Sequence, residues 1–194
     1  MNQSLVNKVE NLVFEKFKNS KRLIHILGVA KLAKELAIKF GLDADKAYVT
    51  GLLHDFCKYE TLDEMKKIIN DEQIIKKFES APQIYHAYAA SAWVKDNLEI
   101  EDEEILNGIK YHVYGRTGMS LFEKIIVLSD YCEDSREYET CKKVRRILND
   151  DKFDLAMYLC IKYTIESVLT HGDKPLPEQY EILNELEKNI RSFT

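Results

Sequence analysis

Residues that interrupt helices are scarce in this sequence, because the 194-residue chain contains only 7 Gly and 3 Pro. A chain with so few helix breakers favours long helices over a turn-rich β architecture. No stretch shows a convincing period-two alternation of apolar and polar residues, and no run approaches the roughly 20 apolar residues that span a bilayer. We therefore expect an all-α protein with no membrane-spanning segment.

Cysteine and positive charge are also limited. The 4 cysteines include no C-x-x-C pair, and the N-terminal stretch lacks the continuous apolar core of a signal peptide. Both features predict reduced thiols and a cytoplasmic protein. Cys57 and Cys132 are better explained as small buried residues than as thiolate metal ligands. The formal net charge of −5 argues against a general nucleic-acid-binding surface.

The chain is long enough to bury one sizeable core and too short to favour two domains. We expect a single domain over residues 1–194, with its core at about 21–180. Capping boxes are predicted at Thr61/Glu64 and Ser120/Glu123. The polar stretch 71–84 predicts a loop with a short helical piece. Apolar periodicity and breakers predict helices at about 4–18, 21–40, 44–57, 61–70, 86–98, 102–113, 121–135 and 152–170, and a last one opening at Pro177.

Several polar residues fall on the apolar faces of these predicted helices. Positions three, four or seven residues apart share one face of a helix, and by this spacing His25 lies with Val29 and Leu32. A buried charge is costly unless something pairs with it, so these groups need partners. The residues placed inward in this way are His25, His54, Asp55, His86, His112 and Asp130.

Taken one at a time, these residues have an ordinary interpretation. A single inward histidine is usually a core residue hydrogen-bonded to a carbonyl, and a single inward aspartate is usually a cap or an ion-pair partner. The apolar stripes around these six groups offer too few hydrogen-bond or ion-pair partners to satisfy each group separately. A shared metal centre satisfies all of them, because imidazole and carboxylate are suitable ligands for transition ions, and the number of donors leaves room for a second metal.

The order of the motifs resembles a known family. The blocks HILGVAKLAKELA, GLLHDFCK, YHAYAAS, GIKYHVYGRTGMSLFEKIIVLSDYCEDSR and THGDKPLP are similar to those of the HD-domain metal-dependent phosphohydrolases, and within them to the bacterial YqeK-type branch. The resemblance implies an HD-domain helical bundle that holds iron as one or two ions, with other divalent metals left open. It also implies a bis(5'-nucleosyl)-tetraphosphatase that cleaves diadenosine tetraphosphate symmetrically to two ADP.

The resemblance carries roles over to matching positions. It implies that His25, His54, Asp55 and Asp130 hold the principal metal, and that His86 and His112 bind a second metal or the substrate phosphates. Asp55, His86 and His112 are the expected catalytic residues. The expected substrate contacts, in addition to His25, His86 and His112, are Lys58, Arg136, Thr170, His171, Gly172, Asp173, Lys174 and Pro175.

Some positions stay open at this point. Lys58 follows His54 by one helical turn, but it is equally well explained as a solvated lysine favoured by a helix C-terminus. Arg116 is a further candidate to offset phosphate charge. Tyr85, Tyr88 and Tyr114 could stack on adenine, although tyrosines at helical spacing more often belong to a core or its rim.

This sequence departs from the family pattern in two places. Val113-Tyr114 stands where the family usually has Thr-Thr, and Glu133-Asp134-Ser135-Arg136 stands where it usually has E-P-G-R. Neither departure touches an expected metal ligand, but both could alter how a nucleotide is gripped.

Three other interpretations remain. The chain could hydrolyse another nucleotide, such as a deoxynucleoside monophosphate or a guanosine alarmone, because HD sites are similar across these activities. It could be a catalytically silent module that binds a nucleotide and signals to a partner, although all six expected ligands are present. A purely structural bundle is the least expected. The sequence leaves open whether the chain forms a homodimer.

Overall fold

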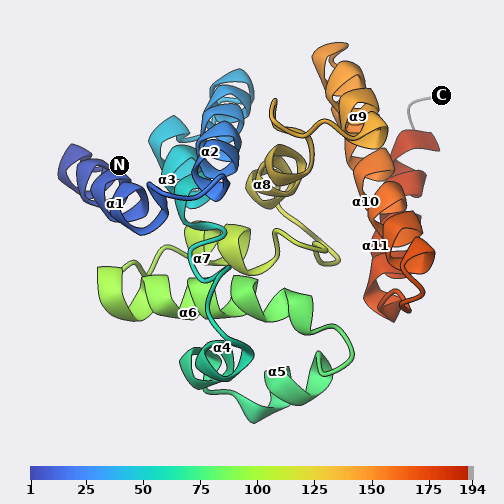
Figure 1. Cartoon of the computed structure of the whole chain (residues 1–194). Coiled ribbons are helices and arrows are strands. Elements are labelled where there is room, and N and C mark those ends of the chain that lie inside the picture. The colour runs from blue at the N-terminus through green and yellow to red at the C-terminus, as the bar shows by residue number, and fades with distance from the viewer. Residues whose placement is uncertain (192–194) are drawn as a thin grey trace.

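The computed structural model describes residues 1–191, and every regular element within them is helical, as expected. None of the described helices is long and apolar enough to cross a membrane. The elements, shown in Figure 1, are α1 (Gln3–Phe17), α2 (Arg22–Lys39), α3 (Ala44–Leu53), α4 (Leu62–Ile69), α5 (Glu72–Lys77), the 3-10 turn η1 (Pro82–Ile84), α6 (Tyr85–Leu98), α7 (Glu103–Lys110), α8 (Leu121–Cys132), α9 (Glu139–Asn149), α10 (Phe153–Thr170) and α11 (Pro177–Arg191).

Two apolar clusters hold these helices together. One cluster joins α1, α3, α6 and α7 and includes Leu52 and Ile109. The other joins α2, α8, α10 and α11 and includes Ile126 and Met157. In Figure 1, α8 lies near the middle of the molecule, with α2 and α3 on one side and α10 and α11 on the other. The polar residues singled out above lie on or next to helices of both clusters.

The close packing of α2 on α3 depends on a glycine. A Cβ atom at Gly51 would lie 2.6 Å from Cα of Ala30, a distance that real Cβ atoms do not tolerate. Gly51 thus allows α3 to approach the backbone of α2. This approach brings the end of α3 beside the start of α2, where His25 lies.

Three helices end earlier than predicted: α3 at Leu53, α7 at Lys110 and α8 at Cys132. His54, Asp55 and His112 consequently lie in the turns just beyond a helix. The imidazole Nδ1 atoms of His54 and His112 lie 2.6 Å and 2.7 Å from the carbonyl oxygens of Gly51 and Ile109, three residues earlier. A side chain that bonds the last carbonyls of a helix competes with continuation of the helix, which accounts for the early ends of α3 and α7.

Other local predictions had mixed outcomes. The capping box at Thr61/Glu64 is complete. At Ser120 only half of the box forms, because the Glu123 carboxylate pairs with Arg116 instead of returning to the helix start. The stretch 71–84 contains α5 and η1, in agreement with a loop carrying short helical pieces. The sequence reading assigned no helix to residues 139–149, and the structure has α9 there.

Candidate metal centre

Imidazole and carboxylate groups from several elements converge on one buried site. His54 is fully buried, and Asp55, His86 and His112 are at most 3% exposed. His25 comes from α2, His54 and Asp55 follow α3, His86 lies in the first turn of α6, His112 follows α7 and Asp130 lies near the end of α8. The structure thus brings together all six groups that the sequence placed on inward faces.

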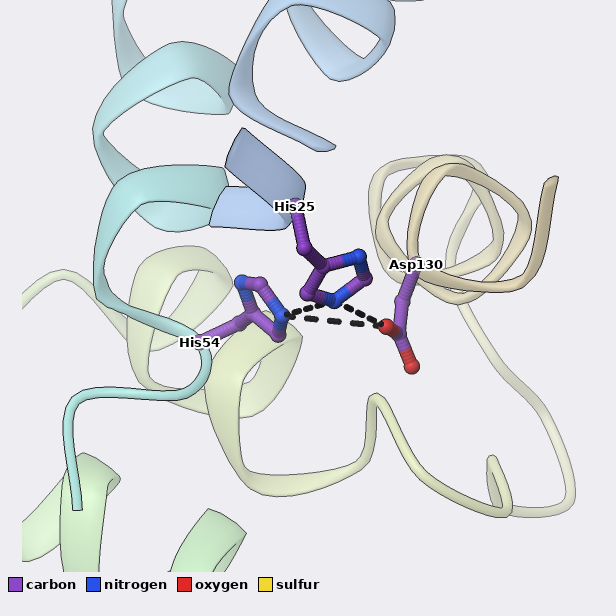
Figure 2. Close-up of side chains that lie close together, drawn as sticks. All are labelled: His25, His54 and Asp130. Carbon is purple, nitrogen blue, oxygen red and sulfur yellow. Dashed lines mark hydrogen bonds and ion pairs between the residues drawn. The ribbon is translucent and has the colours of Figure 1, made fainter. Parts of the chain in front are cut away.

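One side of the site, which we call the Asp130 half, consists of His25, His54 and Asp130 (Figure 2). Nε2 of His25 lies 3.0 Å from Oδ1 of Asp130, and Nε2 of His54 lies 3.7 Å from the same oxygen. The two Nε2 atoms are 3.4 Å apart. In Figure 2 both imidazole rings and the carboxylate point toward one another, an arrangement that could hold a metal ion.

The other side, which we call the histidine half, consists of His86 and His112. Their Nε2 atoms are 3.2 Å apart and lie 3.1 Å and 3.7 Å, respectively, from Oδ1 of Asp55. His54, Asp55 and His112 form a second group whose donor atoms are close enough to hold an ion.

Asp55 lies between the two halves. Its Oδ2 faces the Asp130 half, 3.4 Å from Nε2 of His54 and 3.8 Å from Nε2 of His25. Its Oδ1 faces the histidine half and, among the described residues, is buried and accepts no hydrogen bond, with Nζ of Lys58 3.7 Å away. A buried carboxylate oxygen that accepts no hydrogen bond is costly. A cation between Oδ1 and the facing imidazoles would remove this cost, so the donor set fits a metal.

Backbone carbonyls orient most of these imidazoles. The Nδ1 atoms of His54, His86 and His112 each lie 2.6–2.7 Å from the carbonyl oxygen three residues earlier. A carbonyl oxygen only accepts, so Nδ1 must donate, and in the neutral ring Nε2 then carries the free lone pair. All three rings therefore present an Nε2 lone pair to the centre of the site, as expected of a metal ligand.

His25 is oriented by a side chain instead. Its Nδ1 lies 3.0 Å from Oε1 of Glu133, which is 1% exposed and also accepts hydrogen bonds from the backbone and hydroxyl of Ser135. Gly28, one turn after His25, leaves room for this carboxylate, since a Cβ there would lie 2.3 Å from Oε2 of Glu133. A carboxylate behind a ligand histidine fixes its orientation and raises its basicity.

The pKa values reflect these surroundings. Burial alone would lower the pKa of His25, but its hydrogen bonds with Asp130 and Glu133 outweigh burial and raise that pKa above its ordinary value. Burial lowers the pKa of His86 to about 4, so this ring is neutral near pH 7 and its nitrogen can bind a metal. Burial would raise the pKa of Asp130, but its hydrogen bond with His25 and the charge of Arg136 hold that pKa well below the ordinary value. The pKa of Asp55 also lies well below its ordinary value despite burial.

Three cations surround the carboxylates. Arg22 donates to Oδ2 of Asp55 at 3.0 Å. Lys58 lies 3.7 Å from Oδ1 of Asp55 and 3.2 Å from Nε2 of His86. Arg136 donates from Nε to the backbone carbonyl of Asp130 and from Nη2 to its carboxylate. Positive charge is therefore available at the site in addition to any metal.

The site opens into a cleft with a volume of about 720 Å³. Lys58, His86, Asp130 and Arg136 line its inner part, and residues of α10 line the opposite wall. Thr170 and His171 of the expected substrate segment also line the cleft. The structure does not bring the whole segment there, because Gly172, Asp173, Lys174 and Pro175 lie outside its lining.

The structure decides two points that the sequence left open. Arg116 forms a two-pronged ion pair with Glu123, with both N–O distances 2.7 Å, and does not line the cleft. Tyr85 is a core residue with its hydroxyl donated to the carbonyl of Ile75, so its ring is not available to a base. Cys57 and Cys132 are free and buried, and burial raises the pKa of both thiols to about 12, as expected for residues that are not ligands.

Reasoning from the sequence missed two residues of the site. Arg22 lies three residues before His25 and so shares its face of α2, which is the only signal that could have indicated it. Glu133 was noted only as the first residue of the stretch that departs from the family pattern, since nothing in its sequence neighbourhood indicates that its side chain turns back to α2 and contacts His25.

Comparisons with known proteins agree with this geometry. Residues 22–135 match the HD domain family. The chain is 34% identical over 164 residues to the symmetrical bis(5'-nucleosyl)-tetraphosphatase of Bacillus subtilis strain 168, covering 84% of this chain and 88% of that protein. It is 32% identical over 168 residues to the protein of the same name from Halalkalibacterium halodurans, covering 85% and 88%.

A solved structure is also similar. The crystal structure of a predicted HD superfamily hydrolase involved in NAD metabolism from Clostridium acetobutylicum superposes with a TM-score of 0.86 at 29% identity, covering 94% of this chain and 97% of that one. The matched residues 22–135 contain every member of both halves of the site and Asp55 between them. The chain belongs to the HD domain family.

Proposed function

We propose that this protein hydrolyses diadenosine tetraphosphate symmetrically to two ADP, using two metal ions held on either side of Asp55. The names of its relatives support the reaction. The observation that carries the proposal is the Asp55 carboxylate, whose two oxygens face two different sets of imidazole nitrogens while Oδ1 has no hydrogen-bond donor among residues 1–191.

The donor set suggests which residues would hold the ions. His25, His54 and Asp130 would hold one ion, His86 and His112 the other, and Asp55 would contact both. We propose iron as the metal, and a mixture of imidazole and carboxylate also suits other divalent transition ions. When bound, such ions lower the pKa of water and offset charge on phosphate oxygens.

The chain's own residues position the substrate for attack. Asp55 is ionised near pH 7 and can accept a hydrogen bond from the attacking water, holding it toward the central phosphoanhydride. Water adds across the central P–O–P bond. One ADP keeps the oxygen of the water and the other leaves with the bridging oxygen. Because two phosphates lie on each side of this central bond, both products are ADP.

Two cations can offset the charge of the bridge and of the leaving ADP. Arg136 makes two hydrogen bonds to Asp130. Because a guanidinium has five N–H donors, several remain for phosphate oxygens. Lys58 lies beside His86 at the inner end of the cleft, which favours a role at the phosphates over the alternative of a solvated surface lysine. Thr170 and His171 are proposed as further contacts along the cleft, and Gly172–Pro175 as the part of the segment that moves toward a bound nucleotide.

We also propose that the chain acts as one HD-type domain. Helices from both ends of the described chain contribute to one site, since α2 supplies His25 and α10 lines the cleft. A cytoplasmic location is supported by four free cysteines. Whether two copies associate stays a prediction to be tested by the mass of the protein in solution.

The direct test is product analysis with purified protein reconstituted anaerobically with Fe²⁺. Diadenosine tetraphosphate should give ADP alone, with no AMP or ATP. Release of AMP plus ATP, or no turnover by protein that retains its metal, would overturn the substrate assignment. A parallel panel of deoxynucleoside monophosphates and guanosine alarmones distinguishes the rival reactions, and tight nucleotide binding without turnover would support a silent regulatory module.

A further inference from the structure

A second hollow lies beside the cleft and belongs to no part of the metal centre. We call it the aromatic pocket. It lies where α5, α6 and the turn after α7 meet the start of α11, and its volume is about 220 Å³. Four rings and two α11-side residues define it: Phe78, Tyr88, Tyr111, Tyr114, Leu176 and Gln179.

The aromatic pocket and the cleft share a wall. Val113 and Tyr114 line both hollows, and the Tyr114 hydroxyl accepts a hydrogen bond of 2.5 Å from Gln83, which lines the cleft. The segment after α10 runs from one hollow to the other, since His171 lines the cleft and Leu176 lines the aromatic pocket. A ligand that extends past Val113 from the metal centre therefore meets the aromatic pocket next.

The lining offers aromatic surfaces to a flat ring system, and the charged side chains of Lys77, Lys110, Arg116 and Glu178 also border it. Tyr88 lies with its ring centroid 5.2 Å from Phe78 and 6.1 Å from Tyr111, so the rings form a connected wall. The guanidinium of Arg116 covers the Tyr111 ring at 5.3 Å and is itself fixed by Glu123. Rigid aromatic walls of this kind stack on nucleobases without regard to sequence. The volume is below the range typical of pockets for drug-sized ligands, so it suits a single base and not a whole nucleotide.

The alternative hollow on the molecule lacks these features. A third hollow lies against α2 and α9, and its lining contains charged side chains and aliphatic residues but no aromatic ring. It also shares no lining residue with the cleft. Unlike the third hollow, the aromatic pocket combines an aromatic lining with a wall shared with the cleft.

A dinucleotide that is cleaved at its centre has two equal halves, and the protein needs a binding site for the base of each half. The cleft, with Arg136 at its inner part, can take one ADP half. We propose that the aromatic pocket binds the adenine of the second half. The polyphosphate would then cross the shared wall formed by Val113 and Tyr114. The inference rests on the proposed reaction and adds the site that distinguishes a dinucleoside substrate from a mononucleotide. Val113 and Tyr114 of this shared wall are the residues that stand where the family pattern usually has Thr-Thr.

The test compares Tyr88→Leu with the wild type. Tyr88 lines only the aromatic pocket and is half-buried, so the change removes a stacking face without touching the metal centre. We expect the KM for diadenosine tetraphosphate to rise roughly 10-fold, with metal content and kcat little changed. Tyr180→Leu is the matched control, because Tyr180 is an exposed tyrosine of α11 that lines neither hollow, and it should behave as the wild type.

A binding measurement separates this inference from the reaction itself. Calorimetric titration of metal-loaded protein with ADP should give two ADP per chain for the wild type and one for Tyr88→Leu. Leu176→Trp, which fills the pocket from the α11 side, should also give one, and it serves as the second variant if Tyr88→Leu does not fold. One ADP per wild-type chain, or two in both variants, would overturn the inference. Failure of the wild type to cleave diadenosine tetraphosphate while binding two ADP would overturn the reaction and leave the base site standing.

Discussion

The two halves of the metal centre differ in what surrounds them. In the Asp130 half, His25 is held by the Glu133 carboxylate and faces a second carboxylate, and its pKa is raised. In the histidine half, both rings are held by backbone carbonyls, Lys58 lies beside His86, and burial lowers the pKa of His86 to about 4.

This difference suggests different strengths of binding. The Asp130 half offers a full carboxylate of its own in addition to its share of Asp55, whereas the histidine half has two imidazoles and only its share of Asp55. Cations lie beside both halves, Arg22 and Arg136 at the first and Lys58 at the second, so the carboxylate is what distinguishes them. Negative ligands hold a divalent ion more tightly than neutral ones at equal geometry. We therefore expect the ion of the Asp130 half to be permanent and the ion of the histidine half to exchange more readily.

The largest expected effect comes from removing the group that joins the halves. Asp55→Ala should lower the rate of ADP formation by about 1000-fold or more and reduce metal content, because both ions lose a ligand. Asp45→Ala is the control, since Asp45 is a surface residue of α3 paired with Lys34, and it should retain both rate and metal. If Asp55→Ala keeps full metal content and rate, the whole assignment of the site is wrong.

Changing one half at a time tests the difference directly. His86→Ala should leave one tightly bound ion per chain and lower the rate about 100-fold, because only the histidine half loses a ligand. His25→Ala should release the ion that His86→Ala retains. Metal per chain after gel filtration measures both outcomes. A variant pair with the reverse order, in which His25→Ala keeps more metal than His86→Ala, contradicts the proposed asymmetry.

Glu133→Gln tests the Asp130 half without changing any of its expected metal ligands, because Glu133 contacts Nδ1 of His25 on the side of the ring away from the site. An amide oxygen can still accept from Nδ1 of His25 but supplies no charge, so we expect a 10- to 100-fold loss in metal affinity with a smaller loss of fold stability. Competition with a fluorescent chelator gives the affinity. Gly28→Ala should reproduce the loss by pushing the carboxylate away, whereas Glu139→Gln, at an exposed residue, should have none. Unchanged affinity in Glu133→Gln would leave this carboxylate with a purely structural role.

The smallest effect concerns how α3 is held against its neighbours. Gly51→Ala should destabilise the protein by about 1–3 kcal/mol, because its Cβ meets the backbone of Ala30. Gly108→Ala, on the side of the histidine half, meets the Thr50 side chain at 2.9 Å and should cost less, since a side chain can yield. Chemical denaturation measures both. An equal or greater loss in Gly108→Ala would show that the α2–α3 approach is less constrained than its geometry implies.

The six converging groups could be predicted from the sequence because their inward positions follow from local helical spacing. Helical spacing decides which face a residue occupies, and polar groups such as His25 and Asp130 on an apolar face need a shared partner. The helices were predicted for the same reason, except α9. Its apolar stripe of Cys141, Val144 and Leu148 has the correct spacing but stands among charged residues that conceal it.

The remaining features depend on contacts between distant segments. The early end of α3 arises where the His54 ring bonds the carbonyl of Gly51, and nothing in the local sequence distinguishes this from one more turn of helix. Arg116 could have reached the phosphates or Glu123, and only the folded chain decides between them. The contact of Glu133 with His25 spans 108 positions, beyond any pattern within one helix.

The most direct test of the account is anomalous X-ray diffraction at the iron edge from crystals of the iron-loaded protein. Two peaks are expected, one among His25, His54 and Asp130 and the other among His86 and His112, both within bonding distance of Asp55. No peak at these positions, or ions that make no contact with Asp55, would contradict the claim that this carboxylate joins two halves of one metal centre.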